Sequence, residues 1–416
     1  MSLIWRPFTQ MQKASLPLTV VKAKNSTLFL KNKQKVIDAI SSWWLITHGH
    51  CKIELVKALQ ETAENLDQIL FANFTHEKAE QLVKELSELL PKSLDKFFFS
   101  DNGSTAIEVA LKMAVQSFAQ KGQEHRKEFL SFKRSYHGDT AGAMSVSARG
   151  VFTKAYKDFL FPIHLCSQGQ LSTDPDKLFY KDFERKIEKH HKKLCAVIIE
   201  PLIQGAGGMI VWPPAVLERI CRITKSAGLY LIFDEIMTGF GRTGTLFALD
   251  QIKTKPDILC LSKGLTGGFL PLSLTISTEA IYKDFLSQKK EKALLHGHSF
   301  TGNPLSCSVA LANLRLIKKN KAKLQKKWNW IEKTNKQRLA VFKNHPMVKD
   351  VRAKGLIAVI QKEDNYESFF SEQASQKALQ KGVFLRPLGG TVYILPPYCI
   401  TEKELNKTWD VIESLF

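Results

Sequence analysis

Closely paired cysteines are missing from this chain. The seven cysteines among the 416 residues are scattered, and no two have C-x-x-C spacing, so neither a zinc site nor a disulfide framework is indicated. No apolar run of roughly 18 residues is present. The start of the chain, MSLIWRPFTQMQK, also lacks the apolar core and cleavage site of a signal peptide. We therefore expect a cytoplasmic protein with reduced thiols.

Acidic residues are too few to balance the basic ones. The 60 Lys and Arg residues against 40 Asp and Glu residues give a formal net charge of +20. The densest basic runs, 184–193 and 318–330, are dominated by lysine and have few aromatic residues that could stack on bases. We interpret them as solvated helix faces rather than as a nucleic-acid surface, and the positive charge also suits anionic ligands.

Short apolar runs that end in polar or glycine-rich tips alternate with helix-like segments. This alternation is typical of an α/β fold with a mostly parallel sheet. The chain is also longer than a single core usually supports, so we expect a large domain with a smaller one attached. The expected strands lie within 96–104, 128–139, 194–201, 228–235 and 257–264, and further strands of a separate α+β unit are expected at 351–360 and 382–398.

Residue spacing predicts two helices among these strands. The segment 213–228 opens with two prolines, repeats apolar residues on one face and reaches Gly228 just past its end. In 104–114, apolar residues recur at helical spacing, and Asp101 or Ser104 is expected to cap the start.

The polar tips of the expected strands should converge. Carboxyl ends of parallel strands lie along one edge of a sheet, and open α/β sheets bind their ligands outside that edge. We therefore expect a single crevice. The tips are Asn102–Ser104, Tyr136–Asp139, Glu200, Asp234, Glu235 and Lys263.

The first two tips offer an anion site and a flat surface. The stretch SDNGSTAIEVALKMA places small residues at a helix start, where backbone N–H groups and the helix dipole attract phosphate. It lacks the P-loop spacing, and an ordinary capped helix fits equally well. In RSYHGDT, Tyr136 could stack on a flat cofactor, or it could be a packed ring with its hydroxyl satisfied.

Charged residues end two of the most apolar strands. A buried carboxylate at Asp234 or Glu235 needs a cationic partner or a metal, but two adjacent acids do not supply an octahedral ligand set. A lysine at the mouth of a buried crevice has a lowered pKa and bonds to carbonyl compounds as a nucleophile. An ion pair between Lys263 and Asp234 is the alternative.

Pyridoxal phosphate would account for all four tips together. The cofactor needs a lysine that forms a Schiff base, an acid opposite its pyridine nitrogen, a flat face to stack on and a cup for its phosphate. Lys263, Asp234, Tyr136 and the turn at Asn102–Ser104 match these needs one for one.

The motifs DEIMTGFGRTGTLFA, PDILCLSKGLTGG and GNPLSCSVA resemble the signature of class III pyridoxal-phosphate aminotransferases of fold type I. The resemblance runs from about residue 4 to 400. It implies a large cofactor-binding α/β domain at 51–319 and a smaller α+β domain built from 1–50 and 320–416. It also implies a homodimer with shared sites, small-molecule substrates, and no metal, nucleic-acid or membrane partner.

The resemblance also implies a role for each matching residue. Lys263 would hold the cofactor and shuttle a proton, Asp234 would pair with the pyridine nitrogen, and Tyr136 would stack on the ring. The other cofactor contacts would be Asn102, Gly103, Ser104 and His137, with His298 and Ser299 reaching the phosphate from the neighbouring subunit.

Further segments, among them IWRPFTQM, DAISSWWLITHGH and LLHGHSFTGNPLSCS, narrow the resemblance to family members that convert 8-amino-7-oxononanoate to 7,8-diaminononanoate in biotin biosynthesis. Trp43 and Trp44 would wall the pocket for this long keto acid, with Gly297 beside it. Arg386 would bind its carboxylate. From the residues alone, core packing of the tryptophans and a surface salt bridge of Arg386 are the simpler interpretations.

Some positions depart from the family pattern. Phe8 stands where a tyrosine is frequent near the donor site, which removes a hydroxyl. His298 stands in place of a proline, and Asn102 in place of a common serine. We expect S-adenosylmethionine as the amino donor. Lysine as donor, or the activity of another class III omega-aminotransferase, is the alternative.

Overall fold

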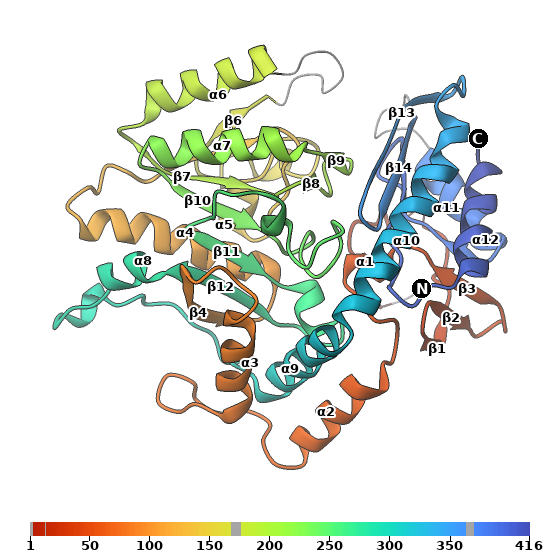
Figure 1. Cartoon of the computed structure of the whole chain (residues 1–416), viewed down its shortest axis with the longest axis horizontal. Helices are drawn as coiled ribbons and strands as arrows, with labels where there is room; N and C mark the ends of the chain where they lie inside the picture. The colour runs from red at the N-terminus through yellow and green to blue at the C-terminus, as the bar shows by residue number, and fades with distance from the viewer. Residues whose placement is uncertain (1–2, 13, 168–175, 363–369) are drawn as a thin grey trace.

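A twisted sheet forms the centre of the larger part of the molecule (Figure 1). The structure is a computed structural model that describes residues 3–12, 14–167, 176–362 and 370–416. Within these residues the sheet has seven strands in the order β4-β12-β11-β10-β7-β5-β6. They are β4 (Leu94–Ser100), β5 (Glu128–Phe132), β6 (His164–Cys166), β7 (Leu194–Ile199), β10 (Tyr230–Asp234), β11 (Ile258–Leu261) and β12 (Ser273–Thr278).

The sheet is mostly parallel, as the sequence predicts. Strand β12 alone among these seven described strands runs antiparallel, and it pairs with β4 on one side and β11 on the other. The remaining pairs are parallel. Strands β7 and β11 are buried throughout, which is the reason they are continuous apolar runs rather than alternating patterns. All five strands expected in this sheet are confirmed, whereas β6 and β12 were not predicted.

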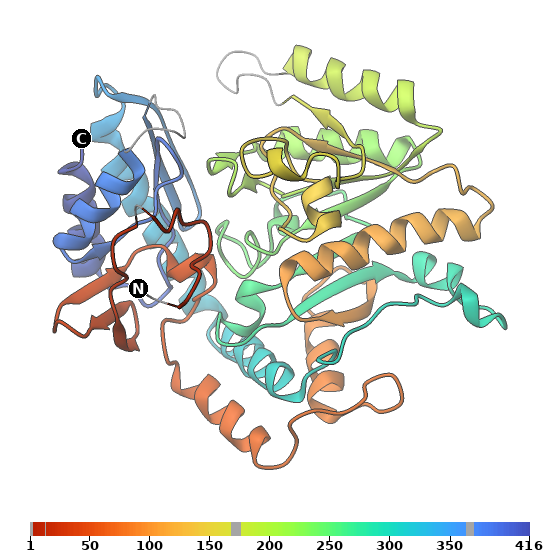
Figure 2. The same cartoon turned by 180° about the vertical axis from the view of Figure 1, so that it is seen from behind.

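Helices cover both faces of this sheet. In β10, Leu231 and Phe233 pack into the core layer that contains α7, whereas Ile232 packs into the layer of α4, because successive strand side chains point to opposite faces. Figure 2 shows α4 crossing the second face. The covering helices are α3 (Glu77–Ser87), α4 (Gly103–Gln120), α5 (Ala141–Ser145), α6 (Asp176–His190), α7 (Pro214–Ser226) and α8 (Glu279–Asp284).

The two predicted helices are present, with one change at a cap. Helix α7 has prolines at its start, and Gly228 just past its end has φ 66°. Helix α4 is capped by Asn102, not by Asp101 or Ser104. The Asn102 side chain accepts from the Thr105 backbone N–H while the Thr105 side chain accepts from the Asn102 N–H. This reciprocal pair joins the residue directly before a helix to its third residue, and because α4 begins at Gly103, those two residues are Asn102 and Thr105.

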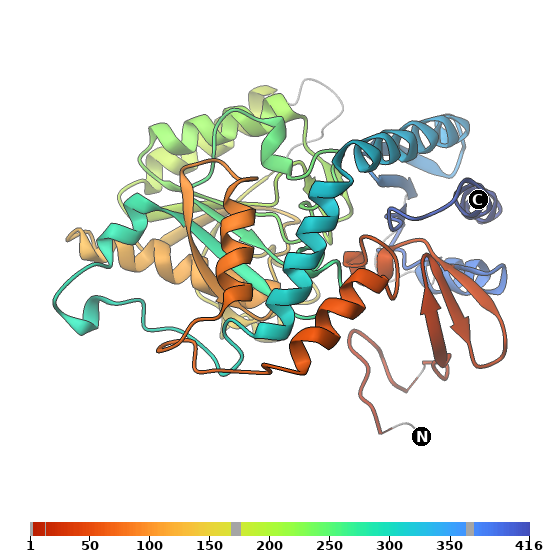
Figure 3. The same ribbon diagram turned by 60° about the horizontal axis from the view of Figure 1, so that its bottom comes forward.

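The smaller part joins the two ends of the chain (Figure 3). Strand β15 (Val383–Phe384) pairs in parallel with β3 (Lys35–Asp38) and so extends the sheet of β1 (Val20–Lys24) and β2 (Thr27–Leu30). A second sheet contains β13 (Val348–Lys354), β14 (Ile357–Lys362) and β16 (Thr391–Ile394). Its helices are α10 (Lys321–Leu339), α11 (Phe370–Gln380) and α12 (Glu402–Glu413).

Helices α9 and α10 run from the larger part to the smaller part (Figure 1). Helix α9 packs against α2 and α3 and is followed directly by α10, which packs on β13 and β14. None of the described helices combines the length and apolar character needed to span a bilayer. The other described elements are α1 (Ser41–Trp44), α2 (Ile53–Ala63), α9 (Pro304–Lys319), β8 (Ile203–Gln204), β9 (Ile210–Val211), η1 (Lys154–Tyr156), η2 (Ala248–Gln251), η3 (Lys263–Thr266), η4 (Lys290–Lys292) and η5 (Ala340–Phe342).

The lysine-rich runs lie on solvated helix faces, as expected. In α6, Phe183 and Ile187 are buried while Arg185 and Lys189 are exposed. In α10, Leu324 and Trp328 are buried while the lysines at 321, 323 and 326 are exposed.

The turn between β13 and β14 gives a test of how the two parts are joined. Gly355 has φ 57°, and a Cβ there would collide with the backbone of Thr243 and Gly244. Gly228 has φ 66° but open space around it. Gly228→Ala should therefore cost about 1 kcal/mol from backbone strain alone, and Gly355→Ala should lower the thermal midpoint clearly further. Equal midpoints for the two variants would contradict this docking.

Candidate active site

The predicted polar tips meet at the carboxyl edge of the large sheet. Asp234 is the last residue of β10, Glu200 directly follows β7, and Lys263 follows β11 after one residue. Tyr136 lies four residues beyond β5, and α4 begins after β4. These side chains reach one edge because β4, β5, β7, β10 and β11 all run in the same direction and end there.

Asp234 and His137 form the most buried charged contact of the site. The Asp234 Oδ2 lies 2.7 Å from His137 Nδ1, and their side chains are 5% and 0% exposed. The second oxygen, Oδ1, accepts from the Ile236 N–H at 3.1 Å. His137 Nε2 is buried without a hydrogen-bond partner among the described residues. Asp234 is therefore held in one orientation.

Lys263 occupies a strained backbone position at the start of η3. Its φ of 42° lies in the left-handed region, which costs a non-glycine residue free energy. Its Nζ lies 4.7 Å from the centroid of the Trp44 ring. Burial lowers the pKa of Lys263 to about 8, although Asp234 and Glu200 act in the opposite direction. Within the described residues, Asp234 pairs with His137, and the alternative ion pair between Lys263 and Asp234 is not formed.

Glu200 positions the loop that carries Tyr136. Its Oε2 accepts from the Tyr136 N–H at 3.0 Å, and its Oε1 accepts from the Gly205 N–H at 2.8 Å. Burial, helped by the charge of Asp234, raises the pKa of Glu200 to about 7. One buried carboxyl thus ties together the loops that follow β5 and β7.

Glu235 corrects one expectation. We expected a cationic partner or a metal for a buried carboxylate, but both Glu235 oxygens accept backbone N–H groups, from Ala248 and Leu249, at 2.7 Å each. These are free donors at the start of η2, which is the reason no cation is needed. Burial raises the pKa of Glu235 to about 8.

Tyr136 and the start of α4 face each other across a short loop. The Tyr136 hydroxyl donates to Asp139 Oδ2 at 2.8 Å, and the Asp139 N–H donates to Ser104 Oγ at 3.3 Å. Burial raises the pKa of Tyr136. Gly103 packs closely on Ile236, since a Cβ at Gly103 would lie 2.9 Å from it.

The predicted substrate residues form an aromatic wall. Trp44 is buried and its Nε1 donates to the Tyr393 hydroxyl at 2.9 Å, whereas Trp43 is 37% exposed. The Arg386 guanidinium lies 4.1 Å from the Trp43 ring centroid. The Phe8 ring meets Trp43 edge to face at 5.6 Å. Within the described residues Arg386 forms no salt bridge, so the simpler interpretation of this residue is not supported.

The segment before these tryptophans is strained and held by two groups that sequence reasoning missed. Ser41, Ser42 and Trp44 all have positive φ. Asp38 accepts from the Ser42 N–H at 2.7 Å. Arg242, only 1% exposed, donates to the Trp44 and Ile46 carbonyls at 3.3 and 2.9 Å. The available signal was weak, because Arg242 lies inside the quoted motif but its partners are distant in sequence.

Three predicted residues are not brought into this site by the single chain. Gly297 and Ser299 are exposed, and His298 is half-buried, on the segment before α9. His298 Nε2 lies 4.0 Å from Asp101 Oδ1, next to the start of α4. The predicted contribution of this segment from a neighbouring subunit stays a prediction.

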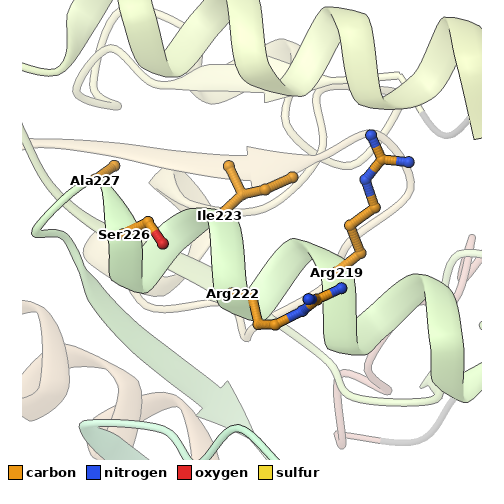
Figure 4. Close-up of a pocket in the computed structure, with 5 residues that line it drawn as sticks. All are labelled: Arg219, Arg222, Ile223, Ser226 and Ala227. Atoms are coloured by element: carbon orange, nitrogen blue, oxygen red, sulfur yellow. The ribbon is translucent and has the colours of Figure 1, made fainter.

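A separate hollow on the solvent side of α7 contains none of the predicted site residues. It is lined by Arg219, Arg222, Ile223, Ser226 and Ala227 (Figure 4). The guanidinium of Arg219 stacks at 3.8 Å on the ring of Tyr180 and pairs with Glu184 at 3.5 Å, so this arginine is already committed to α6.

The family can be assigned by comparison with known proteins. The model of the family described as aminotransferase class-III matches residues 8–416. The chain belongs to the class III aminotransferases. It is therefore an aminotransferase, and the expected α/β fold with a mostly parallel sheet and a smaller α+β part from both chain ends is confirmed.

Its relatives and structural neighbours point the same way. The adenosylmethionine-8-amino-7-oxononanoate aminotransferase of Synechococcus elongatus is 41% identical, covering 99% of this chain and 98% of its own. The crystal structure of the enzyme with the same name from Methanocaldococcus jannaschii has a TM-score of 0.92 at 34% identity, covering 99% and 97% of the two chains. A PLP-bound amine transaminase from an uncultivated Pseudomonas species gives a TM-score of 0.93 at 26% identity, covering 100% and 98%.

Proposed function

We propose that this aminotransferase uses pyridoxal phosphate to convert 8-amino-7-oxononanoate to 7,8-diaminononanoate in biotin biosynthesis, with S-adenosylmethionine as the amino donor. The observation that carries the proposal is near-full-length identity of 35 to 41% to relatives that bear the name of this reaction. The wall of Trp43, Phe8 and Arg386, in which the Trp43 and Phe8 rings are exposed, supports a long substrate with a carboxylate.

The residues present fit pyridoxal phosphate. The orphaned Nε2 of His137 and the Lys263 amine, which has no recorded hydrogen bond in the described chain, are polar groups near the Asp234 carboxylate. The first amides of α4 at Gly103 and Ser104 have no carbonyl partner in the preceding turn, as at any helix start, and suit a phosphate. Asn102 would fix this turn through its capping box.

When bound, the cofactor supplies an aldehyde that bonds to amines and a ring that accepts electrons from the adjacent carbon. Asp234, oriented by His137, would hold the proton of the ring nitrogen. Lys263 Nζ would anchor the cofactor. It would also carry a proton between the substrate carbon that bears the amine and the cofactor. Its lowered pKa suits this, because general acid–base catalysis is most efficient when the pKa is near the working pH.

The aromatic wall would select the substrate. Trp43 and Trp44 offer apolar surface to the chain of the keto acid, with Gly297 at its rim, and the Arg386 guanidinium offers paired N–H donors to the carboxylate. Phe8 would contact the donor without the hydroxyl of a tyrosine. Lysine as donor is therefore the alternative that the structure makes worth testing.

The assembly and location follow from the same proposal. The segment with His298 and Ser299 is exposed and carries apolar side chains, with Leu295 69% and Phe300 63% exposed. A second copy of the chain would cover it and bring both residues to the phosphate, in a homodimer without nucleic-acid or membrane partners. Seven free cysteines, five of them buried, suit a reducing cytoplasm. We keep 51–319 and 1–50 with 320–416 as the proposed domain bounds.

Lys263→Ala should abolish the visible absorbance of the holoenzyme. The absorbance arises from the covalent bond between lysine and cofactor, which alanine cannot form. Absorption spectra of purified wild type and variant would be compared. Lys255→Ala is the control, because the hydrogen bonds of the Lys255 amine within the described part of the chain go to the carbonyls of Leu249 and Ile252 and not to the site. An unchanged spectrum in Lys263→Ala would overturn the cofactor assignment.

The cofactor-free enzyme should bind pyridoxal phosphate faster as the pH rises through about 8, because only the neutral Lys263 amine attacks the aldehyde and its pKa is about 8. Asp234→Asn removes a charge that raises this pKa, so the midpoint of the rate profile should move to lower pH. Glu218→Gln, far from the site, should leave it in place. Stopped-flow absorbance measures the rates, and an upward shift in Asp234→Asn would refute the electrostatic account.

The amino donor should be S-adenosylmethionine in preference to lysine. Formation of 7,8-diaminononanoate from the keto acid would be followed by mass spectrometry with each donor in turn. If neither donor supports the reaction, the result would favour another class III omega-aminotransferase activity.

Arg386→Leu should raise the KM for the keto acid more than about tenfold while sparing the donor half-reaction.

A further inference from the structure

A second group of ligand-type side chains lies on the large sheet, at the opposite edge from the active site. Glu128 is the first residue of β5, His164 is the first residue of β6, and His190 is the last residue of α6. Strands β5 and β6 are parallel, so their first residues share the amino-terminal edge. Three elements thus place an acid and two imidazoles together.

The three side chains are in mutual reach of one ion. One potential ligand atom from each lies within 4.8 Å of the other two. His164 Nε2 lies 2.7 Å from Glu128 Oε2, and the rings of His164 and His190 stack at 3.9 Å. In a tetrahedral zinc site with bonds of about 2.0 to 2.1 Å, ligand atoms are about 3.3 Å apart. Side-chain rotations that move the ligand atoms by at most about an ångström or two would therefore bring all three to zinc-binding distances.

The position of the two histidines suits a bound cation. Both residues are half-buried. A neutral imidazole has a free lone pair for a metal. His190 also lies in the last turn of α6, where the helix dipole favours a cation. No hydrogen bond of the His190 ring is recorded within the described residues.

The opposing charges are exposed. Lys193 Nζ is 3.9 Å from Glu128 Oε1, and its side chain is 67% exposed, so it can move into solvent. Lys189 is exposed as well, and His191 points to the Glu188 carbonyl at 2.9 Å instead of into the cluster. Neither lysine contacts Glu128 Oε2, the carboxylate oxygen nearest to His164.

We propose that Glu128, His164 and His190 bind one zinc-class divalent cation at the amino-terminal edge of the sheet. Two imidazole nitrogens and one carboxylate oxygen form a donor set suited to zinc, with water in the fourth position, and unsuited to magnesium, which prefers oxygen ligands. The cation would tie α6 to β5 and β6. This site is separate from the aminotransferase site and does not depend on the proposed substrate.

Isothermal titration of untagged, chelator-treated holoenzyme with zinc chloride tests the proposal. The wild type should bind one zinc per chain at this site. His164→Ala and His190→Ala should each weaken that binding by at least about tenfold, since even outer-shell changes cost this much. His191→Ala is the matched control, because it removes an adjacent exposed imidazole outside the cluster. Magnesium chloride should give no comparable binding.

A second measurement separates loss of the site from loss of the fold. Zinc should raise the thermal midpoint of the wild type and of His191→Ala, because a ligand that binds the folded state stabilises it, and should leave that of His190→Ala unchanged. The visible absorbance of the bound cofactor should be equal in all variants, which shows that they are folded. Zinc binding of equal strength in wild type and His190→Ala, or none in the wild type, would overturn the proposal.

Discussion

The free-energy cost of placing charge at the buried carboxyl edge of the sheet governs the active site. Asp234 is held by His137 and a backbone N–H, and Glu200 is held by two backbone N–H groups. Each buried oxygen therefore has a fixed donor, which is the condition under which carboxylates can leave water. Among the described residues the Lys263 amine has no such partner, and burial lowers its pKa. Burial of the Lys263 amine is thus what makes it a better nucleophile near neutral pH.

The join between the two parts of the molecule is polar and equally constrained. The buried Arg242 guanidinium donates to backbone carbonyls at Trp44, Ile46 and Pro396, which come from both chain ends. The Tyr398 hydroxyl adds a bond to the Phe240 carbonyl. Since these bonds fix the strained backbone that carries Trp44, the ring beside Lys263 depends on contacts made outside the large sheet. The same hydrogen bonds of Arg242 therefore hold both the pocket wall at Trp44 and the contact between the two parts.

The sequence was informative wherever a local pattern determines a place in the fold. Apolar runs with polar tips located the edge at which Asp234, Glu200 and Lys263 meet, because parallel strands end together. Helix spacing located α4 and α7, although the cap at Asn102 depended on side-chain geometry. By contrast, β12 lies antiparallel between β11, the preceding strand in the chain, and the remote β4, and Arg242 acts on partners about two hundred residues away. The free N–H groups that satisfy Glu235 likewise appear only after η2 forms.

The parallel pairing of β15 with β3 has a consequence for how the chain is made. The sheet that begins with β1 near the N-terminus is completed only by residues 383 and 384. During synthesis, the first strands must therefore wait while the entire large sheet emerges and folds, since domains form as units in chain order. Closing so long a loop carries an entropic cost that the finished contacts must offset. Until β15 emerges, strands β1 to β3 lack the strand that completes their sheet, and the growing chain is open to aggregation during that time.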